Sequence, residues 1–310
     1  MAPHNEIIFE PDLSVYITGS VLRGRVCLHT DEKINTKGIQ INFRGECIAR
    51  WAEGNIVYRS EQIYLDRTIV LLDTENDVKE LSIGKHEFPF QVELEDDLPS
   101  TFSIPSFSLL SAHANKDGRV FYSATCTVVR SWSSNIVFKR EFRVFRHLDL
   151  NKLTGGRQPV QVSHEKNVCC LCCMSGPIHV DFTVDKQLYV PGEDIRLSAE
   201  VVNGSNRKIK KCSFNLIKIT TFHGKHNATA TIVEIVASIE KPGIMARKRD
   251  SWSNVLIKVP QLFPSYLQGC SVIDLNYIVE LHVKIAGPTT MLKPAVGVVI
   301  GSIPLAGTVQ

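Results

Sequence analysis

The stretch of the sequence with the most reactive side chains is a cluster of four cysteines, Cys169, Cys170, Cys172 and Cys173, within NVCCLCCMSGP at residues 167–177. Thiolates bind zinc, form disulfides and accept acyl chains, and two pairs in this cluster have the C-x-x-C spacing of zinc sites. A tetrahedral zinc ion needs four ligands. Adjacent residues of an extended chain point in opposite directions, so the cluster alone does not supply all four.

Four interpretations of the cluster follow from its chemistry. His164 and His179 flank it and would be needed to complete a zinc site. A stable disulfide is disfavoured, because the nine cysteines are an odd number and the start of the sequence lacks the pattern of a secretory signal. S-acylation of the four cysteines would attach the chain to a membrane. The simplest interpretation is an edge strand and turn with cysteine as a small hydrophobic residue, and we expect no metal and no cofactor.

Two short basic clusters form the second group of candidate binding residues. Basic side chains near a membrane attract anionic headgroups with about 1 kcal/mol each. A solvated turn is the simplest interpretation of both clusters, and contact with an anionic partner is the alternative. The net charge is −3 over residues 1–155 and +6 over residues 156–310, and the total of +3 is too small to predict nucleic-acid binding. The clusters consist of Arg207, Lys208, Lys210 and Lys211, and of Arg247, Lys248 and Arg249.

No residue pattern of a known catalytic site is present in the sequence. The sequence lacks the G-x-S-x-G, P-loop, G-x-G-x-x-G and H-E-x-x-H motifs. His86 and Glu87 are adjacent, but no second histidine follows at the spacing that a zinc protease requires. We therefore assign no catalytic residues and expect a protein that is not an enzyme.

Alternation of apolar and polar residues dominates the chain and predicts β-strands. In residues 39–47, the apolar or small side chains Ile39, Ile41, Phe43, Gly45 and Cys47 occupy one face, and polar side chains occupy the other. Turn signals such as N-T-K-G and K-P-G separate such segments. No long apolar stripe with helical spacing interrupts them. The sequence therefore predicts an all-β protein whose sheets pack face to face.

The chain also contains an internal repeat. Tyr16-x-x-Gly19 corresponds to Tyr189-x-x-Gly192, and three further segments correspond in the same order. Such a repeat predicts two copies of one β-sandwich. We place the first sandwich at residues 1–151, a linker at 152–174, the second sandwich at 175–305 and a tail at 306–310.

The ordered set of motifs resembles the arrestin-domain proteins of the α-arrestin branch and spans nearly the whole chain. The resemblance implies two arrestin-like β-sandwiches joined by a short hinge. It also implies a cytoplasmic adaptor that engages membrane cargo or receptors and trafficking machinery, in endocytosis, endosomal sorting or ubiquitination, with association at endosomes or the plasma membrane. The motifs are the Tyr16 turn, Gly84–Phe90, Leu98–Ser100, the Tyr122 strand, Leu148–Asn151, Ser175–Pro177, Tyr189–Glu193 and Ile300–Leu305.

The sequence departs from the family pattern in two places. No two prolines are adjacent, so the PPxY motif that recruits ubiquitin ligases is missing, and a ligase would be reached only indirectly. Residues 9–12 are acidic where receptor-binding arrestins carry paired lysines that sense phosphate. Two alternative functions remain open: a stable subunit of a sorting coat resembling retromer, and a carrier of lipids or small molecules. Peripheral contact with a membrane is compatible with each of them.

Overall fold

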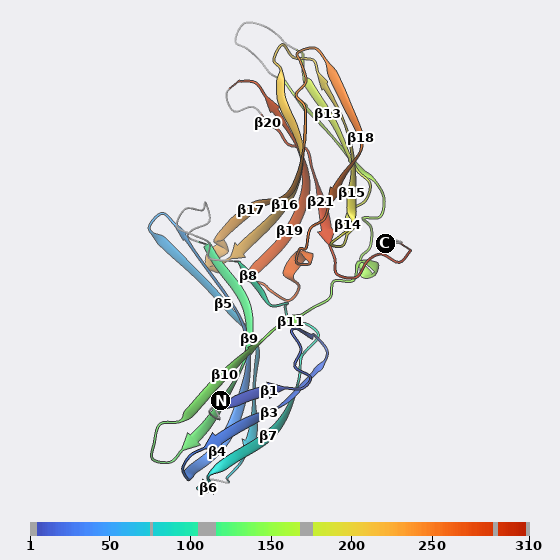
Figure 1. Cartoon of the computed structure of the whole chain (residues 1–310). Helices are drawn as coiled ribbons and strands as arrows, with labels where there is room; N and C mark the ends of the chain where they lie inside the picture. Colours follow the sequence, from blue (N-terminus) through green and yellow to red (C-terminus); the bar gives the residue numbers. More distant parts are fainter. Residues whose placement is uncertain (1–4, 75–76, 105–115, 168–175, 288–290, 308–310) are drawn as a thin grey trace. The chain divides into compact units, whose positions relative to one another are not determined.

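The computed structural model describes the chain except for residues 1–4, 75–76, 105–115, 168–175, 288–290 and 308–310 (Figure 1). In the described residues, helical structure is limited to three 3-10 turns, Leu150–Lys152, Lys225–Asn227 and Ser265–Leu267. Strands make up the rest of the regular structure. None of the described helices is long and apolar enough to cross a membrane. The predicted all-β architecture with two β-sandwiches is confirmed.

The first sandwich packs a small sheet against a large one (Figure 1). The small sheet consists of β1 (Glu6–Phe9), β3 (Val21–Thr30) and β7 (Gly84–Glu93). The large sheet has the order β10 (Ile136–Phe142), β9 (Lys116–Arg130), β4 (Ile34–Glu53) and β5 (Ile56–Leu72), with β6 (Lys79–Leu81) on β4 and β8 (Phe102–Ile104) on β9. A parallel pair of β2 (Tyr16–Ile17) and β11 (Val144–Phe145) completes it.

The longest strand, β4, follows the alternation of the sequence. All five residues that the sequence placed on one face, Ile39, Ile41, Phe43, Gly45 and Cys47, are buried. Their polar neighbours are less buried, so the predicted half-buried strand is confirmed. The strand alternation therefore determines which side chains of β4 enter the core and which lie on the outer surface of the sheet.

An aromatic cluster fills the core between the two sheets of the first sandwich. Phe142, at the end of β10, has the most ring contacts in this cluster among the described residues. Its ring centroid lies between 5.5 and 6.4 Å from those of Phe9, Tyr16, Phe43 and Tyr122. The Tyr122 hydroxyl is also buried and donates a hydrogen bond of 2.6 Å to the Pro99 carbonyl. Aromatic side chains of this size contribute much of the area that a core removes from water.

The second sandwich likewise packs a smaller sheet, here of four strands, against a larger one (Figure 1). The first of these has the order β12 (Val160–Lys166), β13 (Ile178–Val184), β15 (Asp194–Asn203) and β18 (Arg249–Lys258). The larger sheet has the order β14 (Leu188–Tyr189), β21 (Ala295–Ile300), β19 (Ile273–Ile285), β16 (Ile209–His223) and β17 (Thr229–Lys241), with β20 (Met291–Leu292) on β19.

The division of the chain differs in detail from the boundaries expected from the sequence. The first compact unit comprises Met1–Arg146 together with Phe222–Ala230 and Leu267–Ile273, and the second contains the remainder. Strand β12 lies inside the expected linker at residues 152–174 and pairs with β13 along its whole length. The sequence VQVSHEK alternates weakly, and the pairing partner that makes it a strand is not visible in the linker itself.

Gly45 provides a test of the packing between β4 and β9. It lies directly opposite Tyr122, and an added Cβ would overlap the Tyr122 ring and lie 3.2 Å from the Leu65 Cβ. We expect Gly45→Ala to lower the free energy of unfolding by about 1–3 kcal/mol, because the core is overpacked. Gly297→Ala is the matched control, since nothing lies within 4 Å of an added Cβ there. Equal denaturation midpoints for both variants would contradict this packing.

Candidate functional site

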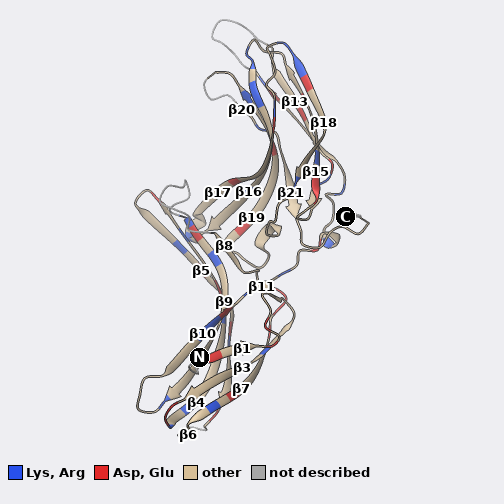
Figure 2. Ribbon diagram, viewed as in Figure 1, with Lys and Arg blue, Asp and Glu red and all other residues tan. Residues whose placement is uncertain are grey.

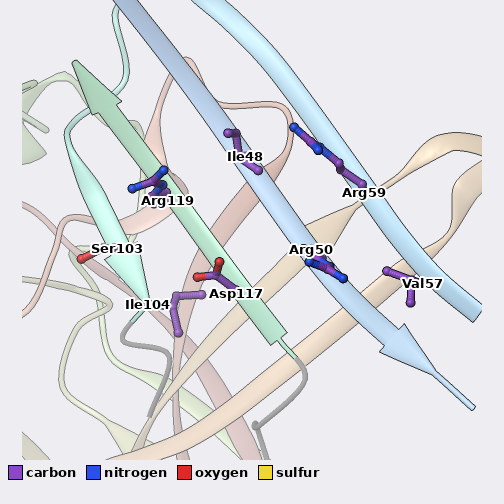
Figure 3. A pocket seen from close by; sticks show the side chains of 8 residues that line it. All are labelled: Ile48, Arg50, Val57, Arg59, Ser103, Ile104, Asp117 and Arg119. Carbon is purple, nitrogen blue, oxygen red and sulfur yellow. The ribbon is translucent and has the colours of Figure 1, made fainter. Parts of the chain in front are cut away.

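A pocket of about 670 Å³ lies in the first unit on the sheet that contains β4, β5, β8 and β9 (Figure 3). Its described lining combines three guanidinium groups, one carboxylate and three aliphatic side chains. The lining residues are Ile48, Arg50, Val57, Arg59, Ser103, Ile104, Asp117 and Arg119. The basic and apolar groups together distinguish it from the ordinary solvated face of a sheet.

Strand register explains how these residues meet, although they are distant in sequence. Arg50 on β4 is paired with Arg59 on β5 and with Asp117 on β9. Arg119 is paired with Ile48 on one side and Ser103 on the other. Because alternate residues of β4 are buried, Ile48 and Arg50 both lie on the opposite, outer face. The pocket is thus lined by neighbouring cross-strand pairs of residues on one face of the sheet.

The positive charges of the pocket are only partly compensated within the described residues. Arg59 forms an ion pair of 2.9 Å with Glu61, and both side chains are well exposed. The Arg119 guanidinium lies 4.2 Å from the centroid of the Phe121 ring. Among the described residues, no carboxylate lies within 4 Å of the Arg50 guanidinium, the distance at which an ion pair forms. Like charges directly opposite on neighbouring strands are destabilising, so the Arg50–Arg59 pair favours an anion between them.

This arrangement is suited to binding an anionic group that carries apolar neighbours. A guanidinium donates two parallel hydrogen bonds to a carboxylate or a phosphate, and three of them line this pocket. Ile48, Val57 and Ile104 offer apolar surface beside them. Sequence reasoning missed this pocket, because no run of basic residues marks it. The outward positions of the arginines are visible in the alternation, but which strands pair is not.

The two basic clusters expected from the sequence lie at the same end of the second sandwich, which we call the basic end (Figure 2). Backbone hydrogen bonds connect the segment around the turn after β15 with the segment around the turn before β18. Asn203 N–H donates to the Lys248 carbonyl at 2.9 Å, and Arg247 N–H donates to the Ser205 carbonyl at 3.2 Å. Ile209 N–H donates to the Ile244 carbonyl at 2.8 Å. The structure thus brings together Arg207, Lys208, Lys210, Lys211, Arg247, Lys248 and Arg249.

An apolar side chain lies among these charges. Met245 is 66% exposed and lies in the turn before β18, two residues ahead of Arg247. Of the basic residues, Lys211 is paired with Glu240 at 2.5 Å, and Arg249 is 4.0 Å from Glu200. The Arg247 Nε donates to the Asn206 side chain at 3.0 Å, which leaves its charge uncompensated there. The combination of excess positive charge and one exposed apolar group is typical of a surface that contacts anionic lipid.

The cysteine cluster, Cys169 to Cys173, lies outside the described residues, between β12 and β13 in the chain. The flanking histidines are described, and they do not converge. His179 is opposite Glu165, whereas His164 is opposite Val180, so the two imidazoles lie on opposite faces of the sheet. His179 instead contacts Asp181 at 3.1 Å. Within the described ranges, no group of three His, Cys, Asp or Glu side chains could hold a metal ion.

Comparison with known proteins identifies the same two domains that the fold contains. Residues 5–151 match the family model described as the arrestin (or S-antigen) N-terminal domain, and residues 174–305 match the C-terminal domain of that family. Arrestin domain-containing protein 4 of Mus musculus is 27% identical over 97% of this chain and 72% of its own length. Arrestin domain-containing protein 17 of Caenorhabditis elegans is 25% identical, over 96% and 70%. Arrestin domain-containing protein 1 of Mus musculus is 25% identical, over 96% and 66%.

Proposed function

Because this chain belongs to the family of arrestin-domain proteins, we propose that it is a non-enzymatic adaptor that binds membrane proteins and recruits trafficking machinery to them. The proposed setting is the cytoplasmic surface of endosomes or the plasma membrane, in endocytosis or endosomal sorting. A ubiquitin ligase would act through an intermediate partner, because no two prolines are adjacent in the sequence.

The observation that carries this proposal is Arg50 directly opposite Arg59 in the arginine pocket of the first unit, where the pocket lining holds three arginines against one carboxylate. Such a pair is costly for the free protein and favourable once an anion lies between the guanidinium groups. The partner that suits it is a cytoplasmic segment of a membrane protein with acidic side chains beside apolar ones. Charge removal from the pocket should therefore release cargo without unfolding the sandwich.

We expect the triple variant Arg50→Gln, Arg59→Gln, Arg119→Gln to recover at least tenfold less of its membrane-protein partners in proximity labelling. Each charge-assisted hydrogen bond contributes about 1.5–3 kcal/mol, so losing even one of them has this effect. The matched control, Arg23→Gln, Lys37→Gln, Arg143→Gln, removes three exposed charges elsewhere in the first unit. An unchanged partner set in the pocket variant, or the same loss in the control, would refute the proposed role of the pocket.

A second candidate function, peripheral contact with anionic membranes, is favoured by the basic end. There two hydrogen-bonded turns bring their charges to one end of the sandwich, and one of these turns carries the exposed Met245. Such contact would hold the adaptor close to its cargo. Electrostatic attraction alone would make the contact reversible. S-acylation of Cys169, Cys170, Cys172 and Cys173 stays a prediction that would strengthen it.

The two alternatives from the sequence have distinct signatures. A subunit of a sorting coat would be recovered in a stable complex of fixed stoichiometry, whereas an adaptor binds its partners transiently. A carrier of lipids would need a closed apolar cavity. The pocket on β4, β5, β8 and β9 instead contains three arginines and an aspartate, which favours an anionic partner over an apolar ligand.

A further inference from the structure

Two cysteines that are distant in sequence meet inside the first unit. Cys47 lies on β4, and Cys270 lies in the turn that precedes β19, within the segment Leu267–Ile273 that belongs to this unit. Their sulfur atoms are 3.8 Å apart, and both are free thiols. Cys47 is fully buried, whereas Cys270 is partly exposed. Cys270 is therefore the more exposed member of the pair, and Cys47 is the protected one.

Hydrogen-bond donors surround the Cys270 sulfur. The Tyr64 hydroxyl lies 3.2 Å from it, and the backbone N–H of Ile273 lies 3.3 Å from it. The Cys47 sulfur, 3.8 Å away, shares a thiol hydrogen bond with it as well. Together these donors stabilise the thiolate and lower the pKa of Cys270, although partial burial acts in the opposite direction. The hydrogen bond with Cys270, together with burial, raises the pKa of Cys47.

Other described cysteines lack such an environment. Cys126 and Cys212 are fully buried in strands, and burial raises the pKa of each to about 12. No donor cluster offsets that burial, so both stay protonated and inert at neutral pH. They therefore serve as internal controls for the reactivity of Cys270.

We propose that Cys270 and Cys47 form a reversible oxidation site, in which Cys270 reacts with a peroxide and Cys47 resolves the product to a disulfide. The Cys270 thiolate attacks one oxygen of hydrogen peroxide, the O–O bond breaks, and with one proton taken up the products are a sulfenic acid and water. The Cys47 thiol then attacks the Cys270 sulfur, the S–O bond breaks, and a second water leaves. Two thiols are oxidised and one peroxide is reduced to two waters. A dithiol reductant restores both thiols. This site does not depend on the proposed adaptor function.

The test is peptide mapping of the full-length protein after treatment with a small excess of hydrogen peroxide at pH 7. Trypsin releases Cys47 in residues 45–50 and Cys270 in residues 259–284. We expect these two peptides to be recovered as one disulfide-linked species that disappears after reduction. The peptides of Cys126 and Cys212 should stay unmodified at the same dose. Mapping at the level of peptides separates this product from any disulfide of the other cysteines.

Single substitutions assign the two roles. In Cys47→Ala the sulfenic acid cannot be resolved, so labelling of Cys270 by dimedone should rise at least fivefold over the wild type. In Cys270→Ala, Cys47 should stay unlabelled, because the buried thiol does not meet the peroxide. Absence of the linked peptide in the oxidised wild type would overturn the proposal, and this result needs no variant to fold. Linkage of Cys270 to any other cysteine, or equal oxidation of Cys126, would overturn it too.

Discussion

Phe142→Ala lowers the free energy of unfolding of the first sandwich by about 3–5 kcal/mol, the largest effect that we expect from a single substitution in this chain. The ring of Phe142 is 5% exposed and contacts four other rings, those of Phe9, Tyr16, Phe43 and Tyr122. Its removal leaves a cavity between two sheets. The surrounding strands are tied by backbone ladders and collapse into that cavity only in part. Urea denaturation followed by tryptophan fluorescence measures the loss.

The control for this variant is an aromatic residue in the same unit that has no packing role. Trp132 lies in the turn between β9 and β10 and is 94% exposed. Trp132→Ala should change stability by less than about 0.5 kcal/mol, because its side chain is already in water. Phe142→Leu, which keeps most of the apolar volume, should lie between the two. A Phe142→Ala variant as stable as Trp132→Ala would show that the aromatic cluster does not hold the sandwich together.

The strands of this fold could be predicted from the sequence, because they depend on local alternation. In β4, each residue assigned to the buried face of residues 39–47 is buried. The sequence predicts a linker where β12 forms, because an edge strand with one neighbour needs little apolar pattern of its own. The segments Phe222–Ala230 and Leu267–Ile273 belong to the first compact unit, which no local pattern in the sequence indicates.

The candidate sites show more clearly that contacts between residues distant in sequence cannot be predicted from local patterns. The basic clusters were visible as runs of lysine and arginine, and the structure added that they share one end of a sandwich. The arginine pocket was invisible, because Arg50, Arg59 and Arg119 are single residues on three strands. Only the register of β4 with β5 and β9 places them together. The Cys47–Cys270 pair is likewise a contact between residues that are distant in sequence. Sites built from runs can be read from a sequence, and sites built from register cannot.

Neutralising part of the basic end should weaken binding to anionic vesicles by up to about 10³-fold. The variant Lys208→Gln, Lys210→Gln, Lys248→Gln, Arg249→Gln removes four exposed charges, each of which contributes about 1 kcal/mol near an anionic surface. Sedimentation with phosphatidylserine vesicles at low salt measures the affinity, and raised salt should weaken binding of the wild type more than binding of the variant.

The control removes an equal charge from exposed lysines of the first unit, Lys33, Lys37, Lys79 and Lys85. If net charge alone attracted the chain to lipid, both variants would lose the same affinity. If the two joined turns of the basic end are the binding surface, only the basic-end variant will lose affinity for the vesicles.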